Sequence, residues 1–174
     1  MTFQALGVTA ARPPAGASTN PVEPRQSWRE RAFDGAARGV LGAMAMTGMR
    51  RLSTGLGLVE KTPPRAMAEE APLFRGILNR LPGDYRDPAI EFAHWSYGAV
   101  GGIGYAVLPE RIRTNRWSGV AYGLGVWAVF ETAFVPLLVL EHARKKTVVS
   151  RVMVALDHAL YGVTLGGPPW RARV

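Results

Sequence analysis

The chain has 174 residues, which is enough for one domain or for one small bundle of membrane helices with its loops. It contains no cysteine, which excludes disulfides, thiolate metal sites, covalent haem attachment and thiol nucleophiles. Its formal net charge of +8 is carried by short basic clusters beside apolar segments, without a recognised nucleic-acid-binding motif. These clusters indicate anionic lipid headgroups, and not nucleic acid, as the partner of the basic residues.

The N-terminal region predicts a flexible tail followed by a helix. Residues 1–26 are rich in proline and small residues, and they have no face that could be buried. Ser27 and Glu30 then have the spacing of a capping box, so we expect a helix from here to about residue 54. Within it we expect a first membrane span over about residues 31–51, with a helix lying flat in the interface as the alternative.

Charged residues are expected at both ends of this first span. Asp34 and Arg38 are four residues apart and are expected to pair along the helix. Arg50 and Arg51 follow the apolar part and are expected to close it. Residues 27–174 as a whole are predicted to form one membrane helix bundle.

The polar connection over residues 56–87 predicts a short amphipathic helix within about 62–82. Thr62, Pro63 and Pro64 are a good helix start, because proline is tolerated in the first turn. Apolar residues then recur on one helical face with basic residues opposite. Such a helix suits either the membrane surface or the end of the bundle.

Three further spans are predicted at about 88–108, 117–140 and 148–167. The second is expected to begin at Asp87-Pro88 and to end before Pro109. The third is long enough to cross a bilayer, and Glu131 is its only charge. The sequence thus predicts an all-α, polytopic membrane protein with a four-transmembrane-helix bundle, multi-pass in the inner membrane. Basic residues are expected on both sides of the membrane, so the positive-inside rule does not determine how the protein is oriented in it.

Two of these spans share a phrase. His94-x-x-Tyr97-Gly98 in the second span is echoed by His158-x-x-Tyr161-Gly162 in the fourth. The echo predicts that the bundle arose from a duplicated two-helix unit, although so short a phrase also arises by chance.

Each span also carries two glycines four residues apart. Because lipid gives no hydrophobic drive between helices, small residues let backbones approach and gain dispersion contacts. We therefore expect close helix packing, within one chain or between chains of a homo-oligomer, through four pairs: Gly35 and Gly39, Gly98 and Gly102, Gly119 and Gly123, and Gly162 and Gly166.

The order of these features resembles a known group. An apolar first segment, a polar amphipathic loop, H-x-x-Y-G in the second and fourth spans and an acidic residue before a proline in the third are similar to the small bacterial inner-membrane proteins of the YagU-like group. The likeness covers about residues 32–167. It implies four helices in a cytoplasmic membrane, and it implies no reaction.

Four ionisable residues are expected at membrane depth: His94, Glu131, Asp157 and His158. Each costs free energy in lipid, so each should face the bundle, pair or be neutral. The depths of Glu131 and His158 match, which predicts a pair between them. Such a pair can be structural, can carry a proton or cation, or the two histidines can bind haem or a metal; the structural role is our interpretation.

These observations favour a membrane protein without catalytic activity. No serine elbow or zinc-protease helix is present, and no metal or cofactor is expected. Glu91, Asp34, Arg38 and Arg151 are expected to reach the interface by snorkelling. Two function classes remain: a stand-alone, transporter-like or stress-related protein, and an accessory subunit of a larger membrane complex.

Overall fold

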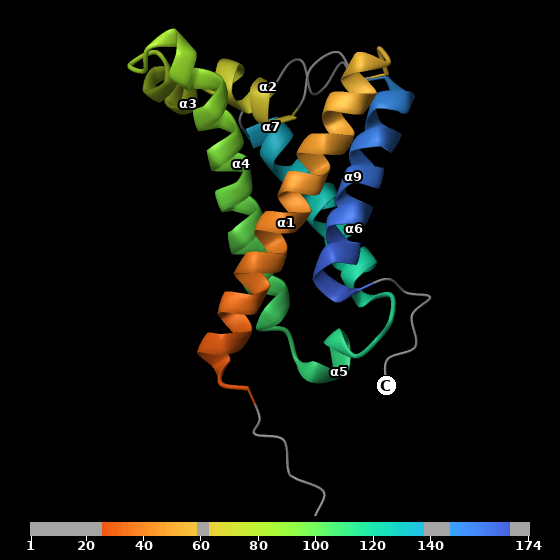
Figure 1. The fold of residues 1–174 in the computed structure, drawn as a ribbon. Coiled ribbons are helices and arrows are strands. Elements are labelled where there is room, and N and C mark those ends of the chain that lie inside the picture. The colour runs from red at the N-terminus through yellow and green to blue at the C-terminus, as the bar shows by residue number, and fades with distance from the viewer. Residues whose placement is uncertain (1–25, 59–62, 138–146, 168–174) are drawn as a thin grey trace, which may run out of the picture.

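The computed structural model describes residues 26–58, 63–137 and 147–167 (Figure 1). The regular structure in these ranges is entirely helical, which confirms the predicted all-α class. The predicted tail, the basic turn between the last two spans and the C-terminal residues from Pro168 onward lie outside the described residues.

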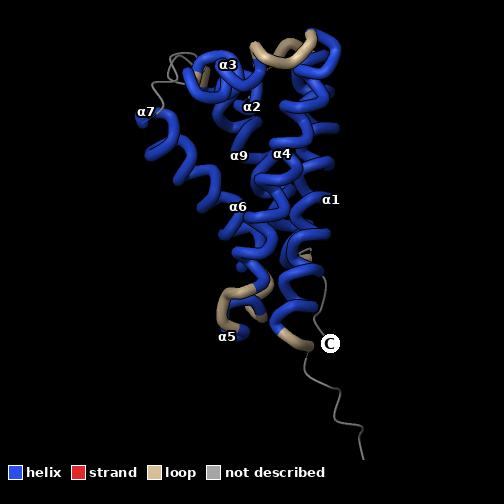
Figure 2. Tube along the Cα trace, turned by 90° about the vertical axis from the view of Figure 1, so that its left-hand side faces the viewer, coloured by secondary structure: helices blue, strands red, loops and turns tan. Residues whose placement is uncertain are grey.

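Long helical segments run alternately up and down the bundle in Figure 1. They are α1 (Trp28–Gly55), α4 (Gly83–Ala106), α6 (Ser118–Val129) continued by η1 (Phe130–Phe134) and α7 (Val135–Leu137), and α9 (Val148–Gly166). Two short helices, α2 (Pro63–Glu70) and α3 (Pro72–Leu78), lie at one end, and α5 (Glu110–Arg113) lies at the other (Figure 2).

Helix α1 begins with the predicted capping box. The Ser27 hydroxyl accepts from the Glu30 backbone N–H at 3.2 Å, and the Glu30 carboxylate accepts from the Ser27 N–H at 2.7 Å. Its 28 residues correspond to a length of about 42 Å at 1.5 Å per residue. The expected Asp34–Arg38 pair is wrong, because Arg38 donates instead to the Leu165 carbonyl on α9 at 3.3 Å.

Two predicted helix boundaries are also wrong. Helix α4 begins at Gly83 and contains Pro88, because a proline near the start of a helix removes few backbone bonds. The loop expected to hold one amphipathic helix contains two, because Pro72 cannot continue α2 and instead opens α3 after Ala71.

The third long segment changes its winding at Glu131. Residues Phe130–Phe134 form a π-helix, in which the Val135 N–H bonds the Phe130 carbonyl. Pro136 follows after Val135, and a proline ring clashes with the carbonyl four residues earlier, which a wider turn relieves. Met67 and Ala71 of the α2 end pack on Phe130 and Val135, so α2 lies against this wider turn.

Glycines bring the long helices together in two pairs. A Cβ added at Gly35 would lie 2.5 Å from the Gly102 carbonyl oxygen, and one at Gly39 would meet the Gly98 carbonyl. In the second pair, a Cβ at Gly119 would meet the Gly162 carbonyl. Helices α1 and α4, and likewise α6 and α9, therefore pack backbone against backbone.

Tyrosines join one helix pair to the other. The Tyr161 hydroxyl of α9 donates to the Gly98 carbonyl of α4 at 2.6 Å, and the Tyr122 hydroxyl of α6 donates to the Gly101 carbonyl at 2.8 Å. Gly42 of α1 makes room for the Tyr161 ring, since a Cβ there would lie 2.7 Å from it. The described helices thus form one bundle.

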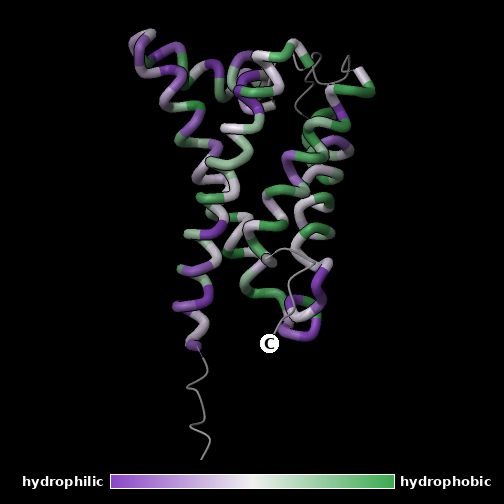
Figure 3. Tube along the Cα trace, turned by 45° about the vertical axis from the view of Figure 1, so that its right-hand side comes forward, coloured by the Kyte–Doolittle hydropathy of each residue, from purple (hydrophilic) through white to green (hydrophobic). Residues whose placement is uncertain are grey.

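Two of the described segments are long and apolar enough to span a membrane, Ser118–Leu137 with mean hydropathy 1.5 and Val148–Gly166 with mean hydropathy 1.3. Within the apolar stretch of each segment, only 17% and 33% of the residues are buried, respectively. Most of their apolar surface therefore faces outward, unlike that of a core helix in a soluble domain. Figure 3 shows hydrophilic residues gathered towards the two ends of the bundle.

Candidate functional site: a buried polar cluster

An arginine lies inside the bundle. Arg50 of α1 is only 6% exposed, and its Nη2 donates to Nε2 of His94 on α4 at 2.9 Å. A guanidinium group can only donate, so Nε2 of His94 must accept this bond. His94 is therefore a neutral imidazole that carries its proton on Nδ1. The expectation that Arg50 ends the span at the headgroups is wrong.

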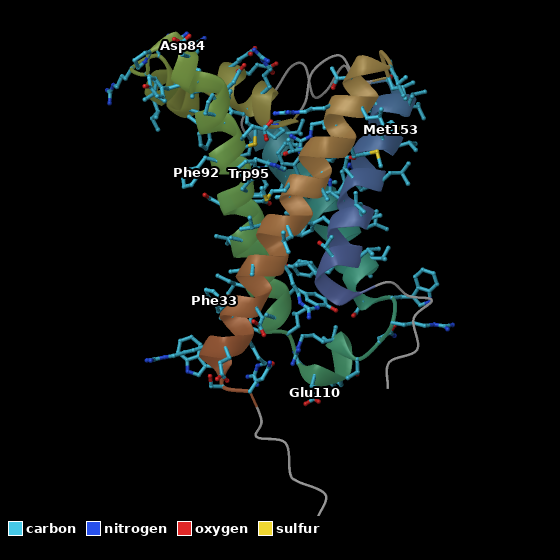
Figure 4. The ribbon with its side chains drawn as sticks, viewed as in Figure 1. Phe33, Asp84, Phe92, Trp95, Glu110 and Met153 are labelled. Carbon is cyan, nitrogen blue, oxygen red and sulfur yellow. The ribbon has the colours of Figure 1, made fainter. Side chains whose placement is uncertain are left out.

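A second set of polar contacts joins α1 to α4 one turn from Arg50. The Thr47 hydroxyl donates to the Glu91 carboxylate at 2.9 Å, and the Trp95 indole N–H donates to the Thr47 oxygen at 3.4 Å. Figure 4 shows Trp95 on the side of α4 that faces α1, and Phe92, which is 70% exposed, on the outer side. Glu91 thus bonds within the helix interface, contrary to the expected snorkelling.

Helix α9 places an acid next to the arginine. Asp157 is 4% exposed, and its charge and that of Glu91 lie close enough to act on Arg50. Asp157 and Arg50 nevertheless form no direct ion pair among the described residues. A charged pair held apart in a low-dielectric interior is costly unless a polar group or water lies between the two charges.

Each of the four packed segments contributes one buried polar atom without a hydrogen-bond partner among the described residues. These atoms are Arg50 Nε, His94 Nδ1, Trp127 Nε1 and Asp157 Oδ1. Trp127 is one turn beyond Gly123 on the same face, and Gly123 lies against the His158 carbonyl, so the indole is at the level of the cluster.

These four atoms differ in what they can bind. Arg50 Nε, Trp127 Nε1 and the protonated Nδ1 of His94 are donors, whereas Asp157 Oδ1 is an acceptor. Buried groups of this kind usually bond ordered water, which can accept and donate at once. The arrangement is therefore suited to hold water molecules between Arg50 and Asp157.

The second histidine is fixed by its own helix. Nδ1 of His158 lies 2.8 Å from the Val154 carbonyl, so in the neutral ring this nitrogen carries the proton. His158 lies close enough to act electrostatically on His94. The structure thus brings together His94, Asp157 and His158. Glu131 is half-buried in η1, and its pairing with His158 stays a prediction.

Sequence reasoning missed Arg50, although a signal for it exists. Gly39, Ala43, Met46 and Arg50 follow one another at spacings of four, three and four residues, and all four are buried. The glycine face of α1 therefore continues through Arg50, while its neighbour Arg51 is exposed. When the helical period of this buried face is continued past the apolar stretch, it includes Arg50 and leaves out Arg51.

The contacts of His94 bear on the alternative in which the two histidines bind haem or a metal. Nε2 of His94 accepts from Arg50 and Nδ1 carries the proton, so the ring presents no free lone pair. The described residues contain no group of three or more histidine, cysteine or acidic side chains that could hold a metal ion.

Comparison with known proteins adds no assignment, since no family model, curated protein or solved structure matches the chain significantly.

Proposed function

We propose that this protein is a stand-alone, transporter-like protein of the cytoplasmic membrane, in which four helical segments cross the bilayer and the Arg50–Asp157 cluster binds and releases a proton. The observation that carries the proposal is the set of four buried polar atoms, one from each packed segment, that have no hydrogen-bond partner among the described residues. Charged residues inside membrane segments are costly, and they commonly mark ion or proton pathways. Kinship with the YagU-like group belongs to the same proposal and rests on the two H-x-x-Y-G phrases.

The chemistry of the cluster favours a proton over a larger solute. Asp157 Oδ1 can take a proton from a hydronium ion in neighbouring water, which forms an O–H bond, neutralises the carboxylate and leaves a neutral water molecule. Arg50 keeps its charge and lowers the cost of returning that proton to water. His94 and His158 are close enough to respond to the same change.

The test is proton movement in vesicles that contain the purified protein and a pH-sensitive dye. With a potassium gradient and valinomycin as the driving force, we expect the wild-type protein to acidify or alkalinise the lumen faster than protein-free vesicles do. Asp157→Asn, which keeps the shape of the side chain but cannot lose a proton, should abolish the extra flux. Asp84→Asn, in the exposed first turn of α4, is the matched control and should keep it.

Equal flux in wild-type and protein-free vesicles would contradict the proton-binding role. Membrane location has its own test, because the protein should stay in the membrane pellet after alkaline and high-salt washing. Recovery in the soluble fraction would refute the whole proposal.

The alternative function, an accessory subunit of a larger membrane complex, is favoured by a different observation. A Cβ added at Gly48 of α1 or Gly125 of α6 would meet no atom within 4 Å, so these glycines face outward and pack on no described residue. Small residues on a lipid-facing surface suit the close approach of another helix. Co-purification of the detergent-extracted protein with large subunits would support this alternative, and a small particle would support the stand-alone protein.

A further inference from the structure

A basic pocket lies where α1 begins and α4 and α9 end. Figure 1 shows these helix ends at the opposite end of the bundle from α2 and α3. Its volume is about 140 Å³. A cavity of roughly 150 Å³ holds a molecule the size of benzene, so a phosphate group fits. The pocket is lined chiefly by charged and polar side chains from α1, the α4 end and the segment after it: Gln26, Arg31, Asp34, Arg38, Tyr105 and Arg113.

The pocket has more positive than negative charge. Three arginines face one carboxylate, and that carboxylate, Asp34, is bonded by the amide of Gln26 at 3.4 Å. Arg31 and Arg38 form no ion pair with any acidic group in the part of the chain that the structure describes. The two guanidinium groups therefore share the pocket with the Asp34 carboxylate but make no ion-pair contact with it.

Backbone carbonyls hold the arginines in place. Arg38 Nη1 donates to the Leu165 carbonyl at 3.3 Å, Arg31 Nη1 donates to the Gln26 carbonyl at 3.0 Å, and Arg113 Nε donates to the Leu108 carbonyl at 3.0 Å. A guanidinium group has five N–H donors in a planar fork, so these bonds leave Arg31 and Arg38 with donors for a ligand. Side chains fixed in this way lose less entropy when they bind an anion.

The position of the pocket along the bundle indicates which ligand it binds. Arg31 lies at the start of the first predicted span, and Gly166 is the last residue of α9, so the pocket is at the level where headgroups lie if the bundle spans a bilayer. Basic pockets between membrane helices bind anionic headgroups. Two planar guanidinium groups can donate paired hydrogen bonds to the oxygens of a phosphate, so they suit a phosphate better than an anion with a single charged atom.

We propose that this pocket binds a phosphate group, supplied by the headgroup of an anionic phospholipid such as phosphatidylglycerol, through Arg31 and Arg38. The lipid as the source rests on the membrane location proposed above, but the phosphate site is independent of proton binding at Asp157. Ala106, Leu165 and Gly35 complete the lining and form its apolar side.

The test is lipid retention by the full-length protein, extracted in mild detergent with equal amounts of phosphatidylglycerol and phosphatidylcholine and measured by native mass spectrometry. We expect the wild-type protein to retain phosphatidylglycerol preferentially. Each of Arg31→Gln and Arg38→Gln should lower this preference about five-fold, the effect of removing one basic contact to an anionic headgroup. Arg151→Gln is the control, because it removes the same charge from an exposed site in the first turns of α9.

The outcomes separate the explanations. Equal preference in the wild-type protein, Arg38→Gln and Arg151→Gln would overturn the proposal, and an equal loss in all three variants would reduce it to non-specific charge. A ³¹P titration with inorganic phosphate, without lipid, distinguishes the source of the phosphate: tight binding that Arg38→Gln abolishes would assign the site to a free phosphate. Asp157→Asn should keep the lipid preference, so failure of proton binding leaves this inference unaffected.

Discussion

Nη2 of Arg50 and Nε2 of His94 lie 2.9 Å apart and join α1 to α4 by a hydrogen bond inside the bundle. The bond lies beyond the glycine contacts of the same two helices, so α1 and α4 are held by backbone packing at one level and by a side-chain hydrogen bond at another. Asp157 of α9 extends the second contact to the other helix pair.

Replacing Arg50 should therefore destabilise the bundle strongly. In Arg50→Ala, Nε2 of His94 loses its donor and Asp157 becomes a buried carboxylate without a nearby cation. Leaving the buried Nε2 of His94 without its donor costs about 1–3 kcal/mol, and the loss of the positive charge near Asp157 adds to that cost. Thermal unfolding in detergent measures the change. The matched control is Arg51→Ala at the exposed neighbouring position, which should change stability by less than about 0.5 kcal/mol.

The sequence predicts the elements of the bundle better than their details. The capping box, the helical class and the extent of α9 follow from local signals, and these are confirmed. The start of α4 and the π-helix were not predicted, because Pro88 is tolerated near the start of a helix and Pro136 widens the turn before it without ending the helix. Which helix packs on which also lies outside local patterns, since every span carries similar glycines.

The site was harder to predict than the fold. His94, Asp157 and His158 stand out as ionisable residues in apolar stretches, which is a signal of composition. Arg50 has no such signal, because it is followed by Arg51 and resembles an ordinary basic flank. Only its register with the buried face of α1 distinguishes it, and that face is established by contacts with α4 and α9.

Gly39 offers a direct test of the backbone contact between α1 and α4. In Gly39→Ala, the new Cβ would meet the Gly98 carbonyl, and neither backbone can give way without separating the helices. Overpacking of this kind costs about 1–3 kcal/mol, which should lower the unfolding temperature in detergent. Gly48→Ala is the control on the same helix. Its Cβ meets nothing within 4 Å, so higher helix propensity should leave stability unchanged or raise it by up to about 1 kcal/mol.

The capping box predicts how the start of α1 responds to acid. Hydrogen bonds from Ser27 lower the pKa of Glu30 below its usual value of 4.5. The bond from the Ser27 backbone N–H has the larger effect, and the bond from its side chain adds to it. The stabilisation is therefore complete above about pH 4.5 and is lost as the pH falls through the lower, folded-state pKa. Hydrogen exchange at residues 28–31 should speed up over that acid range, more than the general pH trend. Glu30→Gln should remove this extra pH dependence, and a wild-type profile in this variant would contradict the assignment.

Glu131 tests whether its predicted pair with His158 is structural. The carboxylate is half-buried in the π-helix, so it must be hydrogen-bonded, paired with an imidazolium or protonated. Glu131→Gln should keep fold, assembly and proton flux, because an amide can still bond the imidazole. Glu131→Leu should lose about 1–3 kcal/mol of stability, because His158 would lose that bonding partner.

Thermal unfolding and size-exclusion chromatography measure stability and assembly, and the vesicle assay measures flux. If Glu131→Gln instead abolishes flux and leaves assembly intact, the proton pathway includes this carboxylate and the structural role is refuted. An experimental structure with the carboxylate farther from His158 than one bridging water can reach would refute the pair under either role.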